Sequence, residues 1–195
     1  MTERLRQNIL RTTGREPSEK DCALLAAHMV PRNFERKTLL SQAGEHCRYV
    51  YFLLEGSAYS SMVNPAGERY AVQFAIENYW ITDHYSFFRD EPGIYTIETL
   101  EATKALVIGA EGYDAVCRAS HFLEHYFRVL ITNAFVALQY RLAKANTETA
   151  AQRYLEFSRR HPDFVQRIPQ YLIASYLGIK PQSLSRIRRS LAQDG

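Results

Sequence analysis

The spacing of apolar residues near the carboxyl end predicts two short helices joined by a tight turn. In the first helix, the residues that recur at helical intervals are Leu172, Ile173, Tyr176 and Leu177. Gly178 follows them, where a left-handed residue ends a helix at little cost. A second helix is predicted from about Pro181, and its apolar face consists of Leu184, Ile187 and Leu191. Helix, glycine-containing turn and helix form the helix-turn-helix arrangement.

The other face of this second helix is polar and basic. Its side chains are Lys180, Gln182, Ser183, Ser185, Arg186, Arg188 and Arg189. Residues 180–191 contain no acidic side chain. Gln and Arg can pair with base edges, and Ser and Lys with phosphate oxygens. The pattern therefore favours a DNA-reading helix over the alternative, a small solvated helical hairpin with a basic surface.

A longer helical pattern, over residues 120–145, has two apolar stripes. The first, whose residues we assign to the dimer helix, consists of Leu123, Phe127, Leu130, Ala134, Ala137 and Arg141. The second consists of Ile131, Phe135, Leu138 and Leu142. A helix with two apolar stripes must bury both, so we expect one stripe to cover the chain's own sheet and the other to pair with a second copy as a short coiled coil. A single buried helix in a monomer is the alternative. We expect Ser120 to cap this helix and residues 145–147 to form a hinge after it.

Between residues 33 and 109 the pattern changes to short strands rich in Tyr, Val and Ile, separated by turns that contain Gly and Pro. This is typical of a small β-sandwich or jelly roll. Before it, residues 1–30 have helical spacing, and Ser18 with Asp21 resembles a capping box. We therefore predict an α+β fold with a sandwich domain over residues 1–119, a dimerisation helix over 120–145 and a helix-turn-helix domain over 146–195.

The distribution of charge supports this division. The chain of 195 residues has a formal net charge of only +3. Residues 1–140, however, carry 14 basic and 17 acidic side chains, whereas residues 141–195 carry 10 basic and 4 acidic ones. The basic character is therefore concentrated where the helix-turn-helix is predicted, which is where a polyanion would bind.

Other features exclude several classes of protein. No apolar run is long enough to cross a bilayer, and the first residues do not form a signal peptide. Cys22, Cys47 and Cys117 are widely separated and lack Cys-x-x-Cys spacing. Such thiols fit a reducing cytoplasm and give no support to a structural zinc site or an iron–sulfur cluster. We expect a cytoplasmic protein without a membrane partner.

In the order and length of its parts, the whole chain resembles the Crp–Fnr superfamily of bacterial transcription regulators. The residues that carry the resemblance are 43–45, 51–56, 72–74, 173–179 and 183–188. The resemblance implies a homodimer in which the second helix of each helix-turn-helix enters the major groove of double-stranded DNA, with Arg186 at a base-contacting position. It also implies RNA polymerase as a candidate partner. Gln182 and Pro181 differ from the residues usual at their positions, and the sequence ends four residues after Leu191, so we expect no winged hairpin after this helix.

The predicted sensor domain departs from relatives that bind cyclic nucleotides. Those relatives carry a Gly-Glu pair and an Arg-Ser or Arg-Thr pair in the loop that holds the cyclic phosphate, because the phosphate needs backbone amides and a guanidinium. Here the corresponding residues are 78–83, and Tyr95 and Thr96 stand where the Arg is expected. We therefore expect cyclic AMP not to be the ligand, and we expect no cofactor. A pocket for another ligand would be lined by Tyr79, Trp80, Thr82, Arg89, Tyr95 and Thr96. An aromatic core or dimer patch explains the same residues equally well.

Motifs for other chemistry are weak. His121 and His125 lie four residues apart on the predicted helix, a spacing that can chelate a metal, but nothing near them in sequence completes a site. No nucleotide-binding loop, hydrolase elbow or zinc-protease motif is present. We thus predict that the protein is a dimeric DNA-binding regulator and not an enzyme. One alternative is a small-molecule-binding module whose terminal helices bind protein, and another is a regulator that needs no ligand.

Overall fold

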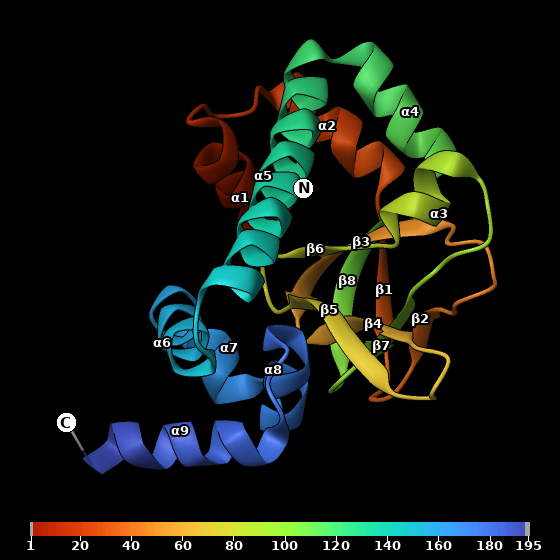
Figure 1. Ribbon diagram of the computed structural model, residues 1–195. Coiled ribbons are helices and arrows are strands. Elements are labelled where there is room, and N and C mark those ends of the chain that lie inside the picture. Colours follow the sequence, from red (N-terminus) through yellow and green to blue (C-terminus); the bar gives the residue numbers. More distant parts are fainter. Residues whose placement is uncertain (1, 194–195) are drawn as a thin grey trace. The chain divides into compact units, whose positions relative to one another are not determined.

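The computed structural model describes residues 2–193 and contains two compact units (Figure 1). The first unit comprises Met1–Ser60 and Phe74–Phe135, and the second comprises Ser61–Gln73 and Val136–Gly195. Each unit is described in turn.

Two helices open the first unit, α1 (Glu3–Thr13) and α2 (Glu19–His28). Gly14, with a φ of 70°, ends α1 in the left-handed conformation. The predicted capping box is confirmed, because the backbone N–H of Asp21 donates to the Ser18 hydroxyl and the Asp21 carboxylate accepts from the Ser18 backbone N–H. Two of the orphan amides at the start of α2 are thereby satisfied.

Two four-stranded sheets form the predicted sandwich. One has the strand order β1-β8-β3-β6 and the other β2-β7-β4-β5. The strands are β1 (Val30–Phe34), β2 (Leu39–Ser41), β3 (Tyr49–Glu55), β4 (Ala58–Val63), β5 (Arg69–Ala75), β6 (Trp80–Ile81), β7 (Thr96–Thr99) and β8 (Thr103–Gly109). The outer ends of β4 and β5, with the turn between them, belong to the second unit.

The central pair β3 and β8 explains why residues 49–54 form an unbroken apolar run. Successive side chains of a strand point to opposite faces of the sheet. On β3, Val50 and Phe52 pack into a cluster with the helices, whereas Tyr51 and Leu53 pack into the cluster between the two sheets. The antiparallel register places Phe52 opposite Leu106 of β8. Both faces of this sheet are buried, so polar residues do not alternate with apolar ones.

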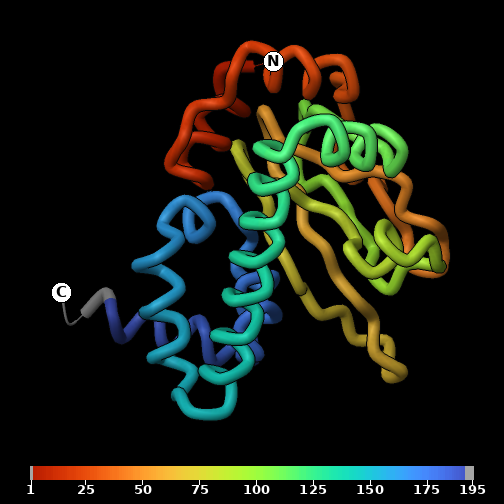
Figure 2. The backbone as a smooth tube through the Cα atoms, turned by 90° about the horizontal axis from the view of Figure 1, so that it is seen from above, coloured from red at the N-terminus to blue at the C-terminus, as the bar shows by residue number. Residues whose placement is uncertain are grey.

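Three further helices complete the first unit: α3 (His84–Arg89), α4 (Ala110–Ala119) and the first half of α5 (His121–Thr147). Ser120 precedes α5, and its hydroxyl accepts from the backbone N–H of Leu123, as expected of a cap. Figure 2 shows α5 as one continuous helix in green and cyan, with the residues of α1 and α2 beside its first turns.

The exposure of α5 corrects the predicted dimer stripe. Leu123 and Phe127 are buried in the core of their own unit and cannot face a second copy. Every residue from 131 to 140 is exposed instead. The most exposed apolar side chains are Phe135 and Val136, each at 58%, and Leu142 at 54%. The first turns of α5 therefore cover the chain's own sheet, and the middle of the helix carries the uncovered apolar surface.

The second unit contains the rest of α5 and four short helices. These are α6 (Ala150–Arg160), α7 (Pro162–Arg167), α8 (Gln170–Leu177) and α9 (Pro181–Gln193). Their buried side chains are Tyr154, Phe157, Phe164, Ile168, Leu172, Ile173, Leu177, Ile179 and Leu184. The expected hinge at 145–147 was wrong by a few residues, because α5 continues to Thr147 and the helix break falls at Glu148 and Thr149.

Candidate nucleic-acid interface and sensor loop

Helices α8 and α9 form the predicted helix-turn-helix. Gly178 ends α8 with a φ of 64°, and its N–H donates to the carbonyl of Ser175 at 3.1 Å. The N–H of Ile179 donates to the carbonyl of Ala174 at 2.8 Å. These two bonds satisfy carbonyls at the helix end and fix the turn. Leu184, only 2% exposed, anchors α9 in the core of the unit.

The polar face of α9 is presented to solvent. Ser183 is half-buried, and the exposed members of the predicted set are Lys180, Gln182, Ser185, Arg186, Arg188 and Arg189. Among the described residues, no carboxylate forms an ion pair with the four cations of this face. The Arg186 guanidinium donates to the Ser183 hydroxyl of its own helix, at 3.3 Å. Unpaired exposed guanidinium groups on one helix face are suited to phosphates and base edges.

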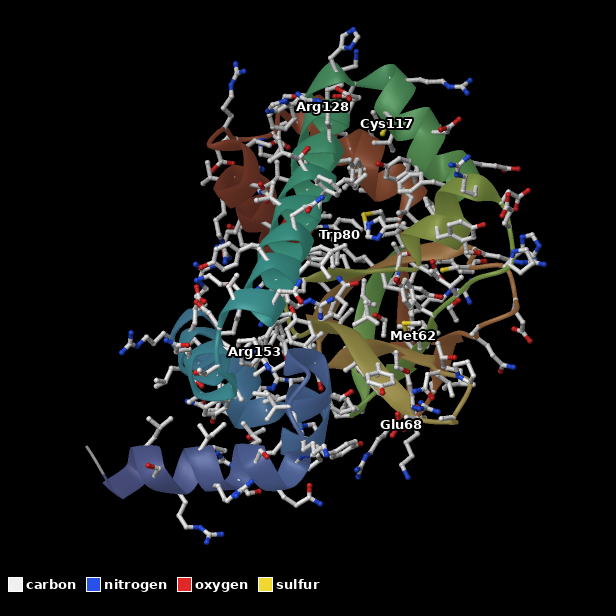
Figure 3. All side chains as sticks on the ribbon, viewed as in Figure 1. Met62, Glu68, Trp80, Cys117, Arg128 and Arg153 are labelled. Carbon is white, nitrogen blue, oxygen red and sulfur yellow. The ribbon has the colours of Figure 1, made fainter. Side chains whose placement is uncertain are left out.

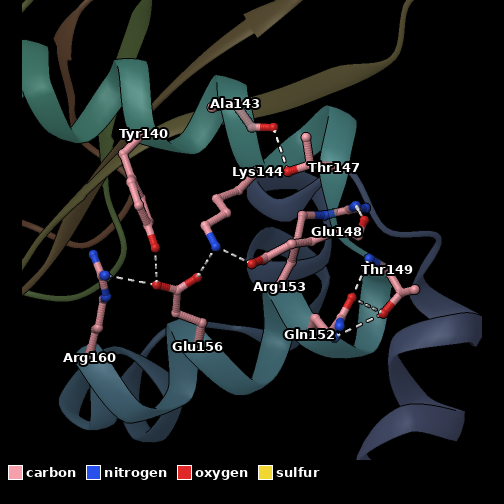
Figure 4. A network of polar contacts seen from close by, with 10 residues as sticks. All are labelled: Tyr140, Ala143, Lys144, Thr147, Glu148, Thr149, Gln152, Arg153, Glu156 and Arg160. Atoms are coloured by element: carbon pink, nitrogen blue, oxygen red, sulfur yellow. Dashed lines mark hydrogen bonds and ion pairs between the residues drawn. The ribbon is translucent and has the colours of Figure 1, made fainter.

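A polar network joins α5 to α6 (Figure 4). The Tyr140 hydroxyl donates to Glu156 at 2.6 Å, and Arg160 forms an ion pair with the same carboxylate at 2.8 Å. Lys144 pairs with Glu148 near the end of α5. The hydrogen bond from Tyr140 lowers the pKa of Glu156, so this carboxylate is ionised at neutral pH. The network fixes α6 against the last turns of α5.

A second set of contacts reaches the helix-turn-helix itself. The Arg153 guanidinium donates from Nη1 to the Glu148 carbonyl at 2.6 Å and from Nε to the Leu177 carbonyl at 3.1 Å. The Ser175 hydroxyl of α8 accepts from the N–H of Ala71 at 3.0 Å and donates to the carbonyl of Arg69 at 3.2 Å. Sequence patterns indicated none of these contacts, because the residues that each contact joins do not lie at a regular spacing on one helix or one strand.

In the first unit, the loop after β6 folds around one carboxylate. Asp83 is 0% exposed, and its Oδ1 accepts from the N–H of Ser86 at 3.2 Å as the N-cap of α3. Its Oδ2 accepts from the N–H of Ile94 at 2.8 Å and of Tyr95 at 2.9 Å. Gly93 is required beside it, since an added Cβ would lie 2.9 Å from Oδ2. Three backbone amides of this loop are therefore bound to the chain's own anion.

The six predicted pocket residues do not share one environment. Trp80 packs on the buried cluster beneath α5, where Figure 3 shows it, and donates from Nε1 to the Tyr126 hydroxyl at 2.9 Å. Thr82 is buried and donates to the carbonyl of Tyr49 at 3.0 Å. Thr96 lies on the other sheet and accepts from the N–H of Ala43. The remaining three are half-buried or exposed: Tyr79, Arg89 and Tyr95.

A shallow cavity of about 310 Å³ lies elsewhere in the first unit. The residues that line it are Thr2, Leu5, Ala26, Met29 and Leu106. His125, half of the histidine pair that could chelate a metal, contacts Arg128 at 2.7 Å through Nδ1. Within residues 2–193, the structure contains no group of three or more His, Cys, Asp or Glu side chains arranged to hold a metal. None of the helices in the same range is long and apolar enough to span a membrane.

Residues 31–120 match the family model of the cyclic nucleotide-binding domain. The search of curated proteins found no match to the chain. Among solved structures, the global regulator CLP of Xanthomonas campestris, described as c-di-GMP responsive, has a TM-score of 0.70 and 12% identity, with 91% of this chain and 93% of that chain covered. A protein of Eubacterium rectale assigned to the crp/fnr family of transcriptional regulators has a TM-score of 0.69 and 15% identity, with 92% and 85% covered. The catabolite activator protein of Thermus thermophilus has a TM-score of 0.60 and 14% identity, with 96% and 88% covered.

The class of the molecule follows from these findings. The chain has the fold of the Crp–Fnr transcription regulators, which confirms the resemblance found in the sequence. None of the three structures above is described as an enzyme. The particular chain combines a region that matches the cyclic nucleotide-binding domain model, residues 31–120, with an acid-free basic face on α9. In the first region, loop amides are bound to Asp83.

Proposed function

We propose that the chain is a sequence-specific DNA-binding transcription regulator in which α9 reads base edges in the major groove. The observation that carries the proposal is the face of α9, where cations and hydrogen-bonding side chains are exposed and residues 180–191 include no acid. Arg186 stands at the base-reading position that the resemblance implies. Lys180, Arg188 and Arg189 supply charges for phosphates. We propose the domain limits 1–119, 120–145 and 146–195 for sensor, dimerisation helix and DNA-binding domain.

The exposed apolar residues of α5 support a homodimer. Phe135, Val136 and Leu142 lie on a stretch of helix that residues 2–193 leave exposed. Pairing two copies along this stretch would bury these side chains, as in a two-stranded coiled coil. A symmetric dimer presents two α9 helices, which must be separated by about 34 Å to reach successive major grooves on one side of the duplex.

The arrangement around Asp83 supports a sensor domain that does not respond to cyclic AMP. A cyclic phosphate would need backbone amides and a cation in this loop. The amides of Ile94 and Tyr95 are already bound to a buried carboxylate, which would repel a second anion. The effector of the sensor domain, under this proposal, is of another chemical class.

Replacement of Arg186 tests the proposed base reading. We expect Arg186→Ala to weaken binding to a selected DNA site by roughly 5- to 150-fold, because a bidentate base contact is worth about 1–3 kcal/mol. Binding to random DNA should change by less than about threefold, because phosphate contacts by the other cations remain. The site is first obtained by selection from random duplexes, and both affinities are measured by fluorescence anisotropy. Arg118→Ala, at an exposed arginine on α4, is the matched control. Equal losses on selected and random DNA would contradict a base-reading role.

The salt dependence of binding separates this function from a protein-interaction role for the same helices. A DNA reader loses affinity steeply between about 50 and 200 mM salt, because phosphate contacts release counterions. Failure of the natural dimer to bind any duplex at low salt would instead favour a small-molecule-binding module whose terminal helices bind protein.

A further inference from the structure

Arg153 occupies a position from which one side chain reaches two helix ends. It lies in the first turn of α6, directly after the break that separates α6 from α5. Its guanidinium donates to two backbone carbonyls. One belongs to Glu148, which lies in that break. The other belongs to Leu177, the last residue of α8 before the turn. Figure 4 shows Arg153 and Glu148 at this junction.

The two acceptors lie at the end of α8 and directly after the end of α5, where a cationic hydrogen-bond donor is favourable. The last carbonyls of a helix lack partners inside the helix and lie at the negative end of its dipole. A guanidinium offers several donors in a rigid plane, so that it can hold two carbonyls in a fixed mutual geometry, whereas an ammonium is a single flexible point charge. At 2.6 and 3.1 Å, both bonds from Arg153 are within normal hydrogen-bonding distance.

The start of α6 is itself firmly fixed. Thr149 and Gln152 form a capping box in which the Gln152 N–H donates to the Thr149 hydroxyl and the Thr149 N–H donates to Gln152 Oε1. Arg153 follows directly, half-buried, on a helix that packs against both α8 and α9. The direction in which α9 leaves the turn is thereby tied to the direction in which α5 ends.

We propose that Arg153 is a positioning residue that sets the orientation of the DNA-reading helix relative to the dimerisation helix. This inference rests on the proposed function, since it concerns how two α9 helices are spaced in a DNA-bound dimer. Arg153 is not itself a base reader, because its Nε and Nη1 donors are bound to backbone carbonyls. Its removal leaves the reading face of α9 chemically unchanged but loosens the angle at which that face is held.

The spacing between DNA half-sites is the property that this role controls. One base pair more or less moves a half-site by about 3.4 Å and turns it by about a tenth of a helical turn. A rigidly positioned pair of reading helices therefore discriminates sharply among spacings, whereas a loosely positioned pair tolerates several. A residue that only stabilises the fold would lower affinity for all spacings alike.

The experiment measures binding of the full-length chain to duplexes whose two half-sites are set at the preferred spacing and at one and two base pairs either side. Arg153→Lys and Arg153→Gln are compared with Arg159→Gln, an exposed arginine on the same helix. We expect the wild type and Arg159→Gln to share one preferred spacing. In both Arg153 variants, the preference over the neighbouring spacings should fall by about fivefold or more, while binding to random DNA changes by less than about twofold.

The outcomes separate this inference from the proposed function. If the wild type does not distinguish selected from random DNA, the proposed function fails. If the wild type does distinguish them but both Arg153 variants keep the sharp spacing preference, only the positioning role of Arg153 fails. Arg153→Lys keeps the charge and most of the side chain, so we expect it to unfold within about 5 °C of the wild type. Loss of the folded state in this variant would make Arg153 a folding residue and would overturn the proposal.

Discussion

Removal of one buried hydroxyl group provides a stringent test of the structure of the first unit. Tyr126 of α5 is 0% exposed. Its hydroxyl donates to Asn8 Oδ1 of α1 at 2.6 Å and accepts from Trp80 Nε1 of β6 at 2.9 Å. The Asn8 amide group then donates to the carbonyl of Asn78 at 2.8 Å. This chain of hydrogen bonds joins the first helix, an edge strand and α5 through a single side chain.

The cost of Tyr126→Phe follows from these contacts. The ring stays in place beside Trp80 and Phe127, so little packing is lost. Two hydrogen bonds disappear, each worth about 1 kcal/mol, and Asn8 Oδ1 is left buried without this donor, so the free energy of unfolding should fall by about 2–3 kcal/mol. For a chain of this size, the melting temperature should fall by about 4–12 °C. Burial also raises the pKa of Tyr126, so its hydroxyl is protonated and can donate at neutral pH.

Urea unfolding followed by tryptophan fluorescence measures this effect directly, because Trp80 is the only tryptophan in the chain and lies within the first unit. Tyr171→Phe, at an exposed tyrosine of α8, is the control and should change stability by less than about 0.5 kcal/mol. In a double-mutant cycle with Asn8→Ala, the two losses should be less than additive, because both break the same bond. A loss of unfolding free energy below about 0.5 kcal/mol for Tyr126→Phe would contradict this chain of hydrogen bonds. Fully additive losses in the double mutant would contradict it as well.

Three further changes test other parts of the chain. Burial raises the pKa of Asp21, but hydrogen bonds from Ser120 and the α2 cap outweigh burial and hold this pKa below its ordinary value. Asp21→Asn should therefore cost about 1 kcal/mol at pH 7, and urea titrations should show the difference from wild type shrinking as the pH falls below about 4. Gly56→Ala should cost about 2–4 kcal/mol, because φ is 93° and the new Cβ would lie 2.5 Å from the Thr103 hydroxyl; an unchanged melting temperature would contradict this. Phe135→Lys should convert the proposed dimer to a monomer in light scattering at micromolar concentration, and an unaltered mass would exclude this face as the interface.

The parts of the fold that sequence reasoning predicted are those in which neighbouring residues determine the outcome. The helix-turn-helix follows from apolar spacing and from Gly178, whose left-handed conformation ends α8. The sandwich follows from short strands rich in β-branched and aromatic residues. The Ser18 cap was correct because capping depends on residues only three apart.

The contacts that were missed join residues far apart in the sequence. Apolar stripes showed that α5 must be covered twice, but not which stripe the sheet would cover. Leu123 and Phe127 were therefore assigned to the dimer helix, although they are buried in their own unit. Arg153 resembled any other helix arginine until the fold brought the Leu177 carbonyl, 24 residues later, within 3.1 Å. No periodicity in a sequence encodes such a pairing, because it depends on how the helices pack.

Asp83 shows how one such contact bears on function. Asp83 precedes the six-residue helix α3, and its side chain caps that helix by accepting from the Ser86 N–H. The fold adds the amides of Ile94 and Tyr95, and thereby gives the loop an internal anion. An incoming anion would have to displace a buried carboxylate that already accepts three backbone hydrogen bonds, which is costly. The contacts that connect this part of the unit to α5 are apolar instead. Phe87 of α3 contacts Tyr113 of α4 with ring centroids 5.7 Å apart, and Tyr113 contacts Phe127 of α5 with ring centroids 4.6 Å apart. Under the proposed function, we expect an effector to act on α5 through these rings, and to bind by apolar contacts beside α3 rather than by a phosphate in the loop.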